Sequence, residues 1–195
     1  MVHTVNCFCN KLTTIELKTK ISLTIDKKEV WLPSNTAHLA IKSLTNSNQF
    51  VRGHKNIFLE ESFLDQEIYH PLYLFPCENA VELTSELVNS FEKPINLIVP
   101  DGTWRQAKKV QRRERFLSSI QAVKITPKTK TIYPLRRQKY EFGLCTHEAI
   151  AFALEIIEGK EAKDVLMENL KIFIDAHLVF REIFDKPEKK NLQKL

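Results

Sequence analysis

The stretch that decides the fold is Ile95-Asn96-Leu97-Ile98-Val99-Pro100-Asp101-Gly102-Thr103-Trp104. Residues 95–99 form a short apolar run typical of a buried strand, and Arg105 to Arg115 has a helical pattern. A carboxylate, a glycine, a hydroxyl and a large aromatic lie between the two. Because α/β enzymes bind ligands where a strand ends and a helix begins, we expect a small-molecule site at Asp101-Gly102-Thr103-Trp104.

The helix expected after this hinge is strongly basic, with six lysines and arginines within eleven residues. Four of them recur at helical spacing on one face: Arg105, Lys108, Lys109 and Arg112. Such a face can simply be solvated, but beside a candidate ligand site it favours the binding of RNA phosphates. The formal net charge of +5 agrees with a nucleic-acid partner.

Strand and helix patterns alternate along the chain. Strands are expected at 14–26, 56–60, 71–75, 95–99 and 122–125. Helices are expected after Ser34-Asn35-Thr36, over 82–91 and 105–115, from Thr146 as the cap to Gly159, and around 165–178. This alternation predicts one α/β domain over residues 1–195, with a mostly parallel sheet and helices on both faces. The charged segment 186–195 is expected to be a frayed tail.

Composition excludes several classes of protein. Apolar residues make up 43% and charged residues 27% of the 195 residues, as in ordinary globular domains. No apolar run reaches the roughly 18 residues that span a bilayer, and we see no signal-peptide pattern, so we expect a cytoplasmic location and no membrane partner. The four cysteines do not suggest a disulfide framework. No G-x-G-x-x-G or P-loop occurs among the four glycines.

Each residue of the hinge has a structural and a functional interpretation. Thr103-x-x-Gln106 is a plausible capping box, worth about 1 kcal/mol to the helix, and the same helix start attracts anions. Trp104 either lines a pocket or belongs to the core. Asp101 at the end of a buried strand is costly unless it is paired, capping or reactive. Asp101, Thr103 and Trp104 are therefore the catalytic candidates.

A second group of polar residues follows in Tyr133-Pro134-Leu135-Arg136-Arg137 and Leu144-Cys145-Thr146-His147-Glu148-Ala149. Arg136 is either solvated or clamps a carboxylate, since a guanidinium binds carboxylates through two hydrogen bonds. Glu148 either complements the dipole of its helix or holds an ammonium group. His147 is expected to be structural or exposed.

With these residues in view, the chain resembles the DTW-domain family, the tRNA-uridine aminocarboxypropyltransferases. Five segments carry the resemblance, in the order of the family and over roughly residues 21–155. They are Pro33-Ser34-Asn35-Thr36, Leu74-Phe75-Pro76, the strand into Asp101-Gly102-Thr103-Trp104-Arg105-Gln106-Ala107, Tyr133-x-x-Arg136 and Cys145-Thr146-x-Glu148-Ala149.

The resemblance implies transfer of the 3-amino-3-carboxypropyl (acp) group of S-adenosylmethionine (SAM) to N3 of a tRNA uridine. It also implies a SPOUT-like fold with a possible trefoil knot in the C-terminal half. Asp101 would be the general base that removes the N3 proton. Arg136 and Glu148 would hold the carboxylate and ammonium groups of the methionyl moiety. The other residues expected around the cofactor are Leu74, Phe75, Pro76, Pro100, Leu144, Cys145 and Thr146.

The chain departs from the family pattern at two places. Relatives commonly carry an N-terminal cysteine cluster, whereas segment 1–13 retains only Cys7-x-Cys9. Two thiolates do not complete a tetrahedral zinc site, so we expect no zinc. Where relatives often show H-x-x-E, this chain has Asp26-Lys27-Lys28-Glu29. The alternatives are a SAM-dependent RNA methyltransferase and a non-catalytic RNA-binding protein, and the oligomeric state stays open.

Overall fold

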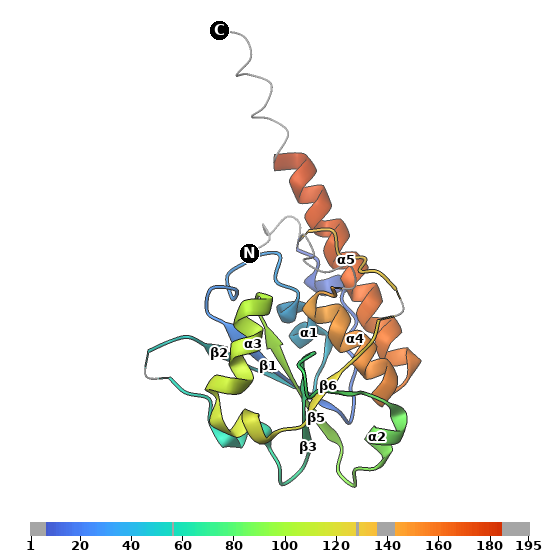
Figure 1. The fold of residues 1–195 in the computed structure, drawn as a ribbon. Helices are drawn as coiled ribbons and strands as arrows, with labels where there is room; N and C mark the ends of the chain where they lie inside the picture. The colour runs from blue at the N-terminus through green and yellow to red at the C-terminus, as the bar shows by residue number, and fades with distance from the viewer. Residues whose placement is uncertain (1–6, 56, 128, 136–142, 185–195) are drawn as a thin grey trace.

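A computed structural model describes residues 7–55, 57–127, 129–135 and 143–184. Its strands are β1 (Lys20–Asp26), β2 (Ser47–Arg52), β3 (His70–Leu74), β4 (Val81–Glu82), β5 (Ile95–Asp101) and β6 (Ala122–Lys124). They form one sheet in the order β2-β1-β5-β3-β6-β4, and every neighbouring pair is parallel (Figure 1). The predicted α/β class with a mostly parallel sheet is confirmed.

Strand β5 is the centre of the sheet and positions the hinge. All seven of its residues are buried, Asn96 and Asp101 included, in agreement with the buried strand predicted at 95–99. It pairs with β1 as far as Asp101, which lies opposite Ile25, but with β3 only as far as Ile98. Pro100 lies beyond the last β3–β5 pair, where a residue without an N–H group is tolerated. Asp101 therefore lies at the carboxyl end of a buried strand.

Helices cover both faces of the sheet. They are α1 (Ala37–Ser43), α2 (Ser85–Asn89), α3 (Trp104–Arg113), α4 (Thr146–Ile157) and α5 (Lys160–Phe184), with 3-10 turns at Cys9–Lys11, Glu61–Leu64 and Arg115–Ser119. Leu97 of β5 packs in a cluster with residues of α1, α4 and α5. Its neighbour Ile98 packs with Ala107 and Val110 of α3. Because successive strand residues point to opposite faces, α3 covers one face of the sheet, and α1, α4 and α5 cover the other (Figure 1).

Some boundaries differ from the sequence prediction. The strand predicted at 56–60 is wrong, because residues 57–60 have no regular structure. The strand in this region is β2, which the prediction missed because it is half-buried along its length and carries no apolar alternation. Strand β1 begins at Lys20, and Ile15 makes only an isolated bridge with Leu44. The two-residue β4, exposed at an edge, was also missed.

The C-terminal half packs two helices together. Helix α4 ends at Ile157, and Gly159, with φ of +108°, separates it from α5, as predicted. None of the helices in the described part of the chain is long and apolar enough to cross a membrane. The predicted trefoil knot stays a prediction, and the predicted tail at 186–195 lies outside the described residues.

Candidate functional site

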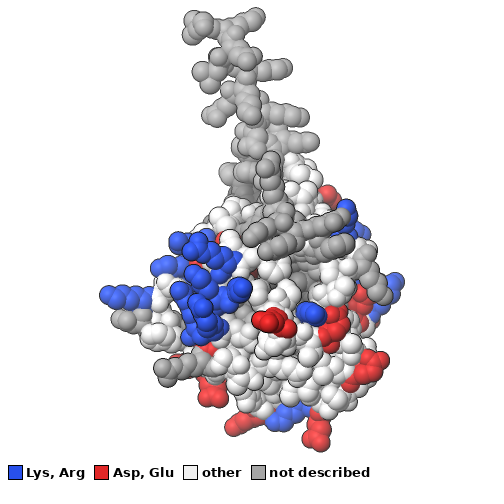
Figure 2. Space-filling model, in the orientation of Figure 1, with Lys and Arg blue, Asp and Glu red and all other residues white. Residues whose placement is uncertain are grey.

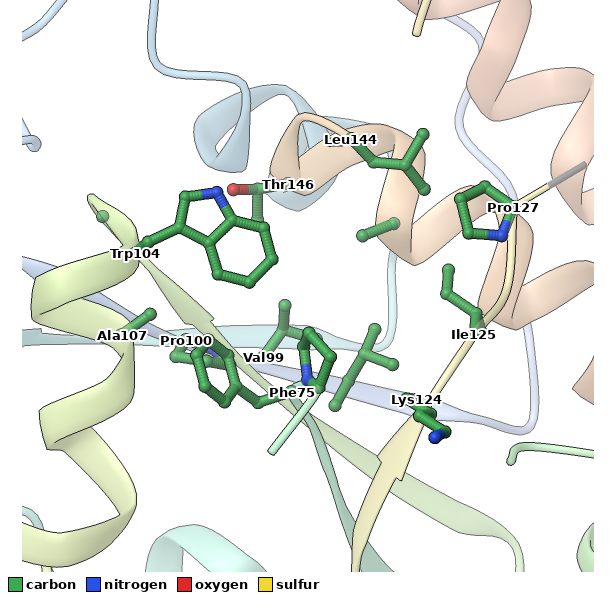
Figure 3. A pocket seen from close by; sticks show the side chains of 14 residues that line it. Phe75, Val99, Pro100, Trp104, Ala107, Lys124, Ile125, Pro127, Leu144 and Thr146 are labelled. Atoms are coloured by element: carbon green, nitrogen blue, oxygen red, sulfur yellow. The ribbon is translucent and has the colours of Figure 1, made fainter. Parts of the chain in front are cut away.

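A pocket opens at the carboxyl ends of the central strands, between α3 and the start of α4 (Figure 3). Seven residues predicted for the site line it: Leu74, Phe75, Pro76, Pro100, Trp104, Leu144 and Thr146. Gly102 of the predicted hinge also lines it, and six further lining residues were not predicted: Val99, Ala107, Lys124, Ile125, Pro127 and Ala149. Pockets at this edge are usual in parallel α/β sheets, because the strand-to-helix loops converge there.

Two aromatic rings give the pocket its shape. Trp104, the first residue of α3, is 37% exposed, and its ring centre lies 5.7 Å from that of Phe75. Figure 3 shows the indole on one side of the pocket, above Phe75 and Pro100 and facing Thr146. Trp104 is therefore part of the pocket wall. Flat apolar walls of this kind suit a purine ring.

Asp101 lies behind the pocket wall and is 4% exposed. Its Oδ1 accepts a hydrogen bond of 2.6 Å from the Thr146 hydroxyl, and its Oδ2 accepts one of 2.7 Å from the Asn35 side-chain amide. These donors come from the start of α4 and from the turn before α1. The carboxylate thus joins three elements that are far apart in the sequence, and Thr146 is the donor that also lines the pocket.

Asn35 holds the other side of this carboxylate. Its amide nitrogen also donates to the carbonyl of Glu29, and its Oδ1 accepts from the Ala37 N–H at the start of α1. Thr36 occupies the N-cap position but forms no capping bond with its side chain. The sequence therefore indicated a cap in this segment but not its link to Asp101. The signal available was that Asn35 lies in one of the segments shared with the family.

Gly102 and Thr103 turn the chain from β5 into α3. Gly102 has φ of +139°, and a Cβ atom there would lie 3.1 Å from Gln106 Oε1. The Thr103 hydroxyl accepts from the Gln106 N–H, while Gln106 Oε1 accepts from the Thr103 N–H at 2.7 Å. The predicted capping box is confirmed. Thr103 does not line the pocket, so its observed role is to begin the helix beside Asp101.

Glu148 and Cys145 do not line the pocket. Glu148 is 1% exposed, and its carboxylate accepts hydrogen bonds from Thr131 Oγ1, Ile132 N and Cys145 N. This geometry ties segment 131–132 to α4 and does not favour the predicted contact with an ammonium group. Burial raises the pKa of the Cys145 thiol well above its ordinary value.

The start of α4 differs from the prediction. The N-cap residue is Cys145, so Thr146 as the cap is wrong. Thr146 is the first residue of the helix, and its hydroxyl donates to Asp101, while the Cys145 N–H donates to Glu148. His147 is fully buried, as one of its two predicted alternatives had it, with Nε2 2.8 Å from the Leu166 carbonyl oxygen. Burial lowers its pKa to about 4.

The expected carboxylate clamp, Arg136, lies outside the described residues. The segment just before it is fixed, because the Tyr133 hydroxyl donates a 2.6 Å hydrogen bond to the Ser34 carbonyl. This bond connects the second polar group of the sequence to the turn that precedes α1. Lys124, at the end of β6, is the basic residue among the described lining of the pocket.

The basic residues of α3 form the largest gathering of positive charge on the face shown in Figure 2. Arg105, Lys108 and Arg112 are exposed, and Lys109 is half-buried. Within the described ranges, none of these four side chains takes part in an ion pair. Their charges are therefore available to an anionic partner next to the pocket.

The N-terminal cysteines are exposed free thiols. The Lys42 ammonium donates to Cys9 Sγ at 3.2 Å, and this hydrogen bond lowers the pKa of Cys9. Among residues 7–55, 57–127, 129–135 and 143–184, no three histidine, cysteine, aspartate or glutamate side chains gather to hold a metal ion. The absence of zinc stays a prediction.

The fold and site together define an α/β protein with an aromatic pocket at the end of a parallel sheet, next to a cationic helix. The DTW domain model matches residues 1–178. The chain therefore belongs to the DTW domain family, as the resemblance in its sequence indicated.

Two curated relatives have the same name, tRNA-uridine aminocarboxypropyltransferase 2. The protein of Macaca fascicularis is 27% identical over 138 residues, which is 64% of this chain and 46% of the relative. That of Drosophila melanogaster is 32% identical over 100 residues, 51% of this chain and 39% of the relative. The chain thus spans less than half the length of these relatives.

A solved structure has a similar fold. It is the SAM-dependent rRNA:acp-transferase Tsr3 from Vulcanisaeta distributa, with a TM-score of 0.51 over 85% of this chain and 80% of that chain. The sequence identity is 19%, so the likeness concerns the fold. It agrees with the predicted α/β class.

Proposed function

We propose that this chain transfers the 3-amino-3-carboxypropyl group of SAM to N3 of a uridine in tRNA. Two observations support the choice of reaction: the family membership and the name shared by the curated relatives. The structural neighbour, a SAM-dependent transferase of the acp group to rRNA, agrees with SAM as the donor.

The observation that carries the proposal is the pocket with Thr146 on its wall and Asp101 directly behind it. SAM is the donor substrate. Its adenine would lie in this pocket, where the apolar lining that includes Trp104 and Phe75 would replace water. Lys124 and the predicted clamp Arg136 are the basic residues assigned to the methionyl carboxylate. Glu148 is not assigned to the ammonium group, because its oxygens already accept protein hydrogen bonds.

The proposed step needs one proton acceptor. N3 of uridine is a weakly acidic imide, and it attacks the Cγ carbon next to the sulfonium. The N3–Cγ bond forms as the Cγ–S bond breaks, which releases 5′-methylthioadenosine. The N3 proton passes to the Thr146 oxygen while the Thr146 proton moves to Asp101 Oδ1, along the hydrogen bond of 2.6 Å. Because sulfonium is already a good leaving group, the site mainly has to position the two reactants.

Mass spectrometry of tRNA nucleosides tests the reaction. Purified protein, SAM and unmodified tRNA transcripts are expected to give acp-modified uridine and 5′-methylthioadenosine. Formation of a methylated nucleoside with S-adenosylhomocysteine would identify a methyltransferase and refute the proposal. The same measurement on tRNA from cells that lack the gene should show loss of acp-uridine. Unchanged tRNA in both experiments would instead favour a non-catalytic RNA-binding protein.

A further inference from the structure

A groove lies on the other side of the hinge from the SAM pocket. It runs between α3 and the turn that follows β1, and its lining includes the hinge residue Thr103. The hinge separates the pocket from the groove, because Gly102 and Trp104 line the pocket while Thr103 lines the groove. A ligand in the groove would therefore lie next to a substrate in the pocket.

Positive charge dominates the groove. Five of its lining residues are lysine or arginine, and two are acidic, Asp26 and Glu29. Arg52 is already paired, since its Nε and Nη2 atoms donate to Glu114 Oε1 at 3.0 and 2.9 Å. The other four cations are Lys28, Arg105, Lys109 and Arg113. In the described part of the chain, none of these four is in an ion pair.

Helix α3 divides its side chains between the two hollows. Trp104 and Ala107 line the pocket, whereas Arg105, Lys109 and Arg113 line the groove. The three cations are spaced by four residues, which places them along one side of the helix. Lys108 and Arg112 do not line the groove. The basic residues that the sequence analysis grouped on one face are therefore not equivalent.

We propose that this groove binds backbone phosphates of the RNA substrate and so places the target nucleotide at the pocket. The proposal rests on the proposed function. SAM carries no phosphate, and its one carboxylate is assigned to the pocket, so phosphates that match these cations would come from the RNA. Lysine and arginine contacts to phosphate fix the register of a nucleic acid without reading its sequence. The groove therefore positions the RNA, and the pocket selects the base.

A matched pair of double variants tests the groove. Lys109→Gln with Arg113→Gln removes two groove cations, and Lys108→Gln with Arg112→Gln removes the same charges from the same helix outside the groove. Affinity for a pool of unmodified tRNA transcripts is measured by fluorescence anisotropy at several salt concentrations. We expect the groove pair to weaken binding at least tenfold near 0.1 M salt and to lower the slope of log K against log salt by about 1.5 to 2. The control pair should change affinity less than threefold.

Equal losses of tRNA affinity in the two double variants would overturn the proposal, because the whole positive surface of the helix would then contribute to binding. Absence of tRNA binding by the unaltered protein would overturn it as well. Competition with inorganic phosphate distinguishes a groove for an RNA backbone from a site for a free anion. If low millimolar phosphate displaced the tRNA effectively, the RNA assignment would be refuted. SAM affinity, measured by calorimetry, should be unchanged in both variants and verifies that they fold. If the proposed reaction is wrong but the groove proposal is right, the unaltered protein binds tRNA and forms no acp-uridine.

Discussion

The Thr146 hydroxyl donates a 2.6 Å hydrogen bond to Oδ1 of Asp101. Thr146 lines the pocket, whereas Asp101 is 4% exposed and lies behind it. The two residues are 45 positions apart and come from different elements. Their contact gives the buried carboxylate a route to the pocket through a hydroxyl, and this route is the chemical centre of the proposed reaction.

Thr146→Val should abolish most of the transfer activity. Valine has nearly the shape of threonine but has no hydroxyl to carry the proton, so we expect kcat to fall by about a hundredfold or more. Thr146→Ser keeps the hydroxyl and should retain activity within a few-fold. Formation of acp-uridine under saturating SAM and tRNA measures the difference. Full activity in the valine variant would rule out Thr146 as a proton carrier.

Trp104→Ala should weaken SAM binding, because the indole forms one wall of the pocket. Loss of an aromatic that stacks on a base commonly costs about 1 to 3 kcal/mol. Trp31→Ala is the matched control, since Trp31 is 76% exposed and does not line the pocket. Calorimetric titration with SAM compares the two variants, and equal affinities would remove Trp104 from the SAM site.

Glu148→Gln should lower the free energy of unfolding by about 1 to 3 kcal/mol, because an amide group would turn a donor towards donors in a buried site. Glu161→Gln is the control, as Glu161 lies in the first turn of α5 and is exposed. Urea unfolding measures both. A Glu148 variant with unchanged stability but weaker SAM binding would restore the ammonium-binding role predicted from the sequence.

Acidification should destabilise the protein through His147. Burial lowers its pKa from 6.5 to about 4, so between these values the unfolded chain binds a proton that the folded chain does not. The stabilisation is complete above about pH 6.5 and decreases as the pH falls towards 4, by roughly 3 kcal/mol in total. His147→Gln should remove this part of the pH dependence. Urea unfolding at pH 7 and pH 5 gives the loss of unfolding free energy between the two pH values for each protein. An equal loss in both proteins would contradict the prediction.

Much of the fold could be predicted from local patterns. The run 95–99 is apolar except for Asn96 because β5 is buried on both faces, and such a run is visible in the sequence. Strand β2 was missed because it is half-buried and polar, so that only its pairing with β1 makes it a strand. Thr146 was misassigned as a cap because a threonine before an apolar helix usually caps it.

The sequence by itself determined the hinge, its capping box and the basic helix, since all three depend on residues within a few positions of one another. Only the tertiary structure decided that Asp101 meets Thr146 and Asn35, and that the cations of α3 are divided between a groove and the outer surface. These relationships arise from packing between distant elements. Chain neighbours set helix caps and periodicity, whereas burial and the order of strands set which side chains converge at the end of the sheet.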